Sequence, residues 1–203
     1  MKRNFSIFYI LLIILCLLVS CSGGGAVPKE LIEDAESDPI EIKDQYELKI
    51  GESGFTVDRR NRNVLEFTLN SVKVADEING KQAASDKDPE RVYVIANFTA
   101  KNHGEIGIST QGIEYPVLVD GSDLGNIKND AVTHRNDLLG IGDRITQFDS
   151  SFNEVGPLEP GDERTGDVLI AADHRSDSYI IYFGYDMEYR NKLTWHFDAE
   201  EAN

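Results

Sequence analysis

The sequence predicts an all-β fold, an antiparallel β-sandwich of seven to eight strands, and three observations indicate it. From residue 45 onward, apolar and polar residues alternate with a period of two. Turn-forming residues separate these runs, and no segment has a convincing helical period. The apolar fraction of 40% is enough to build a core despite a formal net charge of -16. Many short strands without helices favour two packed antiparallel sheets.

The N-terminus has the pattern of a secretory signal peptide. Lys2 and Arg3 precede a nearly unbroken apolar run over residues 5–19. This run is shorter than the roughly 20 apolar residues that a membrane-spanning helix needs, so we expect a cleaved leader rather than a transmembrane anchor.

The leader ends in the tetrapeptide Leu18-Val19-Ser20-Cys21, followed by a serine and three glycines. It resembles the bacterial lipobox, which implies cleavage after Ser20 and lipid attachment, including palmitate, at Cys21. The protein would then be held at the cell membrane through this lipid, on the extracytoplasmic face. The alternative is an uncleaved apolar segment with a chance cysteine.

The second cysteine, Cys16, would leave with the leader, so the folded part would contain none. This excludes disulfides, thiolate metal sites and cysteine nucleophiles from the predicted domain. An exported domain without disulfides favours a Gram-positive-type surface over a periplasm.

We expect three parts along the chain: a signal peptide at residues 1–20, a lipidated cysteine and flexible acidic tether at residues 21–45, and a sandwich domain at residues 46–203. Glycines, prolines and many acidic residues in the second part indicate an extended, self-repelling linker. Because binding to phosphate backbones needs a basic stripe, the acidity of the whole chain argues against nucleic acid as a partner.

The strand signals follow in order. Residues 92–101 alternate most clearly, and residues 65–69 alternate in the same way. The apolar set then moves by one residue, so we expect a β-bulge or a change of sheet near Asn70 and Ser71. Residues 179–183 are apolar on both faces, which suits a central strand. Further strands are expected at residues 55–58, 113–119, 165–171 and 193–197.

Two of these segments resemble parts of a known family. Residues 64–73 (VLEFTLNSVK) and 92–102 (VYVIANFTAKN) resemble the opening strand pair of the telokin-like, immunoglobulin-fold domain of unknown function found in bacterial surface lipoproteins. Residues 158–163 (LEPGDE), with 166–168 (GDV) after them, resemble its second signature. The resemblance covers about residues 50–197. It implies an immunoglobulin-like sandwich on the cell surface and supplies no catalytic residues.

The sequence predicts no catalytic residue, no cofactor and no metal site. It lacks the Gly-x-Ser-x-Gly, His-Glu-x-x-His and Ser-x-x-Lys patterns and a phosphate loop. The histidines fall in turns, loops or an outer strand face, so they are expected to be solvent-exposed. Because no two of them have the spacing of metal ligands, no metal site is predicted there. They are His103, His134, His174 and His196.

Two less favoured sites stay open. Carboxylate and amide oxygens between residues 120 and 130 could hold calcium, although they miss the required spacing and are common turn formers. They belong to Asp120, Asp123, Asn129 and Asp130. The second is a basic cluster of Arg59, Arg60 and Arg62, which is typical of a hairpin turn but could contact phosphate or a partner.

Together these features favour a non-catalytic, surface-tethered binding module with an unknown ligand. The two longest predicted connections, residues 79–90 and 120–148, are its expected binding loops. One alternative is a structural or chaperone-like assembly subunit that contacts an envelope or extracellular protein. Another is a hydrolase that uses carboxylates, which the many acids permit but no spacing supports.

Overall fold

The computed structural model describes residues 27–34, 36, 40–58, 63–108, 116–132, 157–184 and 191–202. The predicted leader, Ser20 and Cys21 lie outside the described residues, as do Arg59, Arg60, Arg62 and His134.

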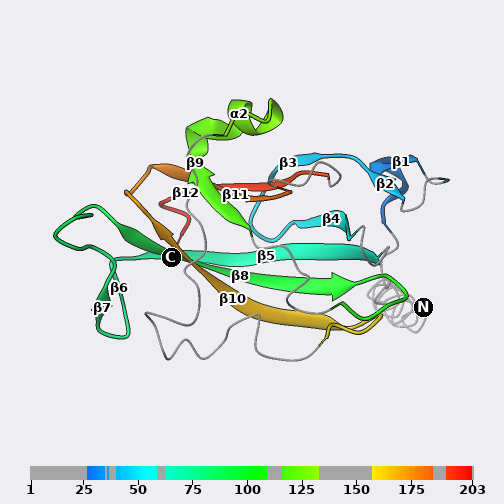
Figure 1. Cartoon of the computed structure of the whole chain (residues 1–203), viewed down its shortest axis with the longest axis horizontal. Helices are drawn as coiled ribbons and strands as arrows, with labels where there is room; N and C mark the ends of the chain where they lie inside the picture. Colours follow the sequence, from blue (N-terminus) through cyan, green and yellow to red (C-terminus); the bar gives the residue numbers. More distant parts are fainter. Residues whose placement is uncertain are drawn as a thin grey trace, which may run out of the picture.

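Two four-stranded sheets pack face to face (Figure 1), which confirms the predicted β-sandwich. The first sheet has the order β10 (Glu163–Ala172), β8 (Val92–Asn102), β5 (Asn63–Ala75) and β4 (Ser53–Asp58). The second sheet has the order β3 (Gln45–Leu48), β12 (Leu193–Asp198), β11 (Ser178–Phe183) and β9 (Val117–Asp120). Short two-stranded ladders join β1 (Ile32–Asp34) to β2 (Glu41–Ile42) and β6 (Glu77–Ile78) to β7 (Lys81–Gln82).

One pairing departs from the predicted antiparallel pattern. Strand β3 lies parallel to β12, while the other strand pairs of both sheets are antiparallel. The sequence pattern misses this because the two strands come from opposite ends of the folded chain, and alternation within a strand does not encode the direction of a distant partner.

The bulge predicted near Asn70 is present. Leu69 pairs with Phe98 and Ser71 pairs with Asn97, so Asn70 is the extra residue in β5. Its side chain is exposed and donates hydrogen bonds of 2.9 Å to Asn97 Oδ1 and Thr99 Oγ1. The bulge keeps the apolar residues on both sides of it on the inner face of the sheet.

Aromatic rings fill the space between the sheets. Phe67 stacks on Phe183 at 4.7 Å between ring centroids, and Trp195 meets Phe98 edge to face at 5.6 Å. Trp195 is completely buried, and its indole N–H donates to the Glu52 carbonyl at 3.0 Å. These contacts bury a large apolar area and satisfy the one polar atom of the indole.

The central position predicted for residues 179–183 is confirmed, since β11 lies between β12 and β9. Tyr179, Ile181 and Phe183 face the core between the sheets. Ile180 and Tyr182 face outward, where Ile127 of the short helix α2 (Leu124–Lys128) covers them. A 3-10 turn, η3 (Gly121–Asp123), leads from β9 into this helix.

Part of the segment that the sequence predicts to be a flexible tether forms secondary structure. A 3-10 turn, η1 (Lys29–Leu31), and strands β1 and β2 form there, and Ile42 is buried against Phe55 and Val57. The Gln45 side chain accepts from Phe55 N at 3.0 Å and donates to Phe55 O at 2.8 Å. The Gln45 side chain therefore covers the edge of β4. The sequence does not reveal this contact, because the few uncharged residues of the segment stand among many charged ones.

Candidate ligand-binding hollow

The loop between β5 and β8, one of the two predicted binding loops, leaves the first sheet as a tight hairpin. Glu77 pairs with Gln82 and Ile78 with Lys81, so Asn79 and Gly80 form a two-residue turn. Both have positive φ, 51° and 78°. Asparagine and glycine adopt this conformation readily, which is why an Asn-Gly pair closes the β6–β7 hairpin.

The chain then turns again before it enters β8. Ser85 and Asp88 exchange backbone hydrogen bonds of 3.1 Å in both directions. The Ser85 hydroxyl accepts from the N–H groups of Lys87 and Asp88, at 3.3 and 3.1 Å. This local network fixes the backbone that carries the side chains of residues 87 and 88.

Apolar contacts hold the excursion against the outer face of the first sheet. Ile78 and Ala83 pack with Tyr93 of β8 and with Leu169 and Ala171 of β10. The Tyr93 hydroxyl donates to the Gln82 carbonyl at 3.3 Å.

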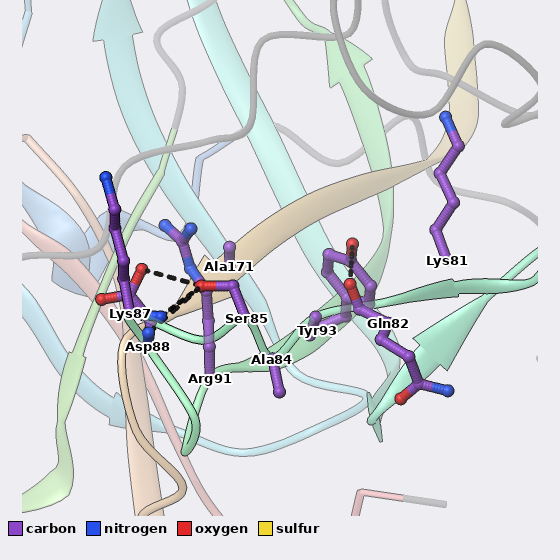
Figure 2. Close-up of a pocket in the computed structure, with 10 residues that line it drawn as sticks. Lys81, Gln82, Ala84, Ser85, Lys87, Asp88, Arg91, Tyr93 and Ala171 are labelled. Atoms are coloured by element: carbon purple, nitrogen blue, oxygen red, sulfur yellow. Dashed lines mark hydrogen bonds between the residues drawn. The ribbon is translucent and has the colours of Figure 1, made fainter.

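Between the loop and the sheet lies a hollow of about 700 Å³ (Figure 2), within the range of small-molecule sites. We call it the loop hollow, and its lining consists of Lys81, Gln82, Ala83, Ala84, Ser85, Lys87, Asp88, Arg91, Tyr93 and Ala171.

Positive charge predominates in this lining, which contains three basic side chains and one acidic side chain. Arg91 is 26% exposed, and its terminal nitrogen lies 3.6 Å from the Asp173 carboxylate, beyond ordinary hydrogen-bond length. Arg91 Nε is buried and has no hydrogen-bond partner among the residues that the structure describes. A buried unsatisfied donor costs about 1–3 kcal/mol, and because Nε is closed to solvent, the terminal nitrogens of Arg91 are the donors that could reach a ligand in the hollow.

The hollow combines fixed apolar walls with adjustable polar groups. Tyr93 and Ala171 are buried and belong to paired strands. Lys87 and Arg91 contribute long side chains with hydrogen-bond donors. Such a combination suits binding and orientation of a small polar molecule that has one flat or apolar side.

The predicted exposed state of the histidines is wrong for His103. Its side chain is only 10% exposed, and its Nε2 lies 2.7 Å from Glu66 Oε2. The ring also lies 6.2 Å from that of Phe55. The pairing of β5 with β8 brings His103 over Glu66 on the outer face of the first sheet, a long-range effect that spacing along the chain does not reveal.

The other described histidines lie elsewhere. His174 is exposed, 4.0 Å from the Asp120 carboxylate, and His196 is partly buried on the outer face of the second sheet. In the described ranges of the chain, no group of three or more His, Cys, Asp or Glu side chains is placed to hold a metal ion.

The residues considered for calcium each have local partners. Asp120 accepts from the hydroxyl groups of Ser122 and Ser176, both at 2.6 Å, and these hydrogen bonds hold its pKa below its usual value. Asp130 pairs with Lys192 Nζ at 2.6 Å. Asp123 accepts from the Asn126 amide, and the Asn129 amide donates to the Gly125 carbonyl.

Of the second predicted binding loop, residues 120–148, the structure describes residues 120–132. This part forms η3 and α2 and packs on β11. The basic residues of the loop hollow are the functional candidates that sequence reasoning missed. Lys87 and Arg91 lie within the alternating charges of residues 86–91 (DKDPER), whose net charge gives no signal. Only folding brings Lys81, Lys87 and Arg91 to one hollow with a single carboxylate, Asp88, in its lining.

Comparisons with known proteins give little beyond this geometry. No protein-family model matches the chain, and no curated protein matches it. An uncharacterized β-sandwich protein from Clostridium difficile 630 is similar in structure, with 14% identity and a TM-score of 0.45 over 78% of this chain and 97% of that one. Among the residues described, no helix is long and apolar enough to cross a membrane.

Proposed function

We propose that the protein is a non-catalytic binding module that takes a small ligand in the loop hollow. The observation that carries this proposal is a space of about 700 Å³ lined by two strand residues, Tyr93 and Ala171, and by polar side chains of the loop (Figure 2). Binding residues commonly lie on loops that a rigid scaffold positions, and here the scaffold is the outer face of β8 and β10.

The sequence supports a location for this module. The lipobox resemblance at Leu18-Val19-Ser20-Cys21 supports a lipid-anchored protein on the extracytoplasmic face of a Gram-positive-type cell membrane. The resemblance to the telokin-like, immunoglobulin-fold surface lipoproteins supports the same location. The Cys21→Ala variant should be released into the medium or remain an unprocessed precursor, whereas normal processing and membrane retention would contradict the anchor.

The binding function is tested by filling the hollow. Ala84 is exposed and lines it, so the Ala84→Trp variant should obstruct the space without removing a charge. The matched control is Ala131→Trp, because Ala131 is an exposed alanine after α2 that does not line the hollow. Immobilised full-length proteins are incubated with the small-molecule fraction of an envelope extract, and bound molecules are identified by mass spectrometry.

We expect a compound that the original protein and the Ala131→Trp variant retain and that the Ala84→Trp variant loses. Thermal unfolding followed by circular dichroism checks that both variants stay folded. Equal recovery from all three proteins, or recovery of no compound by the original protein, would contradict a ligand site in the hollow. A compound that is chemically altered after incubation would contradict the non-catalytic assignment.

A further inference from the structure

We infer that the loop hollow binds a small oxyanion, a carboxylate or phosphate group carried on a compact body, and that Arg91 is its principal anchor. This inference rests on the proposed function of the hollow and names the chemistry of the ligand. It assigns a role to a group of basic side chains that the sequence analysis did not single out.

The state of the Arg91 guanidinium is the first argument. The Arg91 side chain is 26% exposed, its Nε is buried without a hydrogen-bond partner among the described residues, and its terminal nitrogen lies 3.6 Å from the carboxylate of Asp173, which is 71% exposed. Arginine presents a planar fork of donors that matches a carboxylate or phosphate with two parallel hydrogen bonds. Among the described residues the terminal nitrogens of Arg91 have this one long contact, and an oxyanion in the hollow would supply the forked partner that they lack.

The charges around Arg91 are the second argument. Lys87 and Lys81 also line the hollow, against the single carboxylate of Asp88, so its lining has a net charge of two positive. The Lys87 ammonium group has no ion pair within the part of the chain that the structure describes. Asp88 is the acceptor of a long contact of 3.5 Å with the Ser85 hydroxyl. A positive lining is unusual on a chain whose net charge is -16.

The same net charge limits the size of the ligand. Most interactions between exposed charges are screened beyond the Debye length, which is about 8 Å at physiological ionic strength. Acidic groups closer than this to the ligand would still repel a chain of anionic groups. A long polyanion would extend past the hollow toward exposed acids such as Asp86 and Glu90, which adjoin Lys87 and Arg91 in the chain. A small ligand with one or two oxyanion groups would meet only the local positive charge.

The walls indicate what carries the oxyanion. Tyr93 is 7% exposed and Ala171 is 3% exposed, and they belong to neighbouring strands in register. Because both side chains are already covered, they form a fixed base, and the apolar surface open to a ligand comes from small exposed side chains of the lining such as Ala84. An acidic sugar such as glucuronate has the charge and the small size that this lining would accommodate.

The test uses the full-length protein in non-ionic detergent, with glucuronate, inorganic phosphate and glucose as separate probes. Binding is followed by backbone amide shifts and by titration calorimetry. We expect glucuronate and phosphate, but not glucose, to shift the amides of residues 81–93. Raising the NaCl concentration from about 0.05 to about 0.5 M should weaken this binding, because salt screens the attraction.

Three substitutions assign the anchor. Arg91→Gln should weaken glucuronate binding about tenfold, since a charge-assisted, forked hydrogen bond is lost. Arg91→Lys keeps the charge without the fork and should have an intermediate affinity. Lys49→Gln removes one positive charge from an exposed side chain outside the hollow and should change the affinity less than about twofold. A polygalacturonate chain should bind more weakly per sugar than glucuronate at low salt.

The outcomes separate this inference from the proposed function. If Ala84→Trp abolishes retention of an envelope compound but neither glucuronate nor phosphate shifts any amide of the hollow, the oxyanion inference is overturned and the binding function stands. Equal binding of glucose and glucuronate, or an Arg91→Gln variant with unchanged affinity, overturns it as well. If both anions bind through Arg91 while Ala84→Trp retains the envelope compound unchanged, the proposed function fails and the anion site remains.

Discussion

The buried side chain of Asn102 should be among the most sensitive positions of the sandwich. Its Nδ2 donates to the carbonyls of Ile106 at 2.8 Å and Leu158 at 3.0 Å, and its Oδ1 accepts from Gly104 N at 2.8 Å. Asn102 is fully buried, so water cannot replace these partners. At about 1 kcal/mol for each hydrogen bond, Asn102→Ala should lower the free energy of unfolding by about 3 kcal/mol.

The nearly isosteric Asn102→Asp variant should be less stable still at neutral pH, by about 4 kcal/mol or more relative to the original protein, because a buried carboxylate would face two carbonyl oxygens. Burial and these oxygens would raise the pKa of the new carboxyl above its unfolded value of about 3.9. A raised folded pKa means that the folded state holds the proton more tightly. The stability of the variant should therefore fall as pH rises through that pKa and recover as pH decreases.

The assay is urea unfolding followed by tryptophan emission. The chain has a single tryptophan, Trp195, which is fully buried, so its emission should report loss of the core. Free energies are compared at about pH 5 and pH 8 for Asn102→Ala, Asn102→Asp and an exposed control, Asn129→Asp. If Asn102→Asp is as stable as the control, or if its deficit relative to the original protein does not depend on pH, the reasoning about the buried hydrogen-bond network is refuted.

Three further outcomes follow from the fold. Gln45→Ala should lower the free energy of unfolding by about 1–2 kcal/mol, because the Phe55 N–H loses its acceptor. The variant should also associate through the β4 edge, and light scattering that detects only monomer would contradict the edge-covering role. Asp120→Asn should be less stable than the original protein near neutral pH but not in acid. The lowered pKa of Asp120 stabilises the fold at pH values above the ordinary pKa of 3.8, and this contribution is lost as pH falls. Thermal-unfolding profiles of the two proteins that run parallel across pH would contradict this prediction. Deleting Asn70 should preserve the fold, because Val72 and Val74 would stay on the inner face without the bulge, whereas loss of the β-type circular dichroism spectrum would show that the bulge is required.

Strand positions were predictable because burial of one face imposes alternation. The one-residue phase shift in β5 located the bulge at Asn70, since a residue out of phase can keep its neighbours buried only by leaving the ladder. The apolar run of β11 predicted its central position for a similar reason. Both are properties of a strand and its immediate environment, which the local sequence encodes.

Pairing between distant segments was not predictable in the same way. The parallel arrangement of β3 and β12 depends on where the chain enters the second sheet. The packing of Ile42 on Phe55 depends on a few apolar residues within an acidic segment that composition alone classifies as linker. His103 and Glu66 meet only because their strands are paired.

The outer face of the first sheet explains where the loop hollow forms. Its middle is polar, with hydroxyl pairs of 2.7 Å joining Ser53 to Thr68 and Thr99 to Thr165. Its two ends have apolar side chains, and each end is covered by an excursion of the chain, the N-terminal segment over β4 and the β6–β7 hairpin over β8 and β10. Gln45, at the start of β3, also bonds to the edge of β4 through its side chain.

The β6–β7 excursion differs from the N-terminal segment in the side chains that it brings to its end of the sheet. Its apolar contacts come from Ile78 and Ala83, whereas the residues nearer β8 contribute Lys87 and Arg91. Long basic side chains line the hollow beside these apolar contacts without filling it, and their charged ends can stay available. A hollow with a preformed floor and cationic, adjustable walls is the physical consequence. The loop hollow therefore follows from the same need to cover apolar strand ends that shapes the rest of the sandwich.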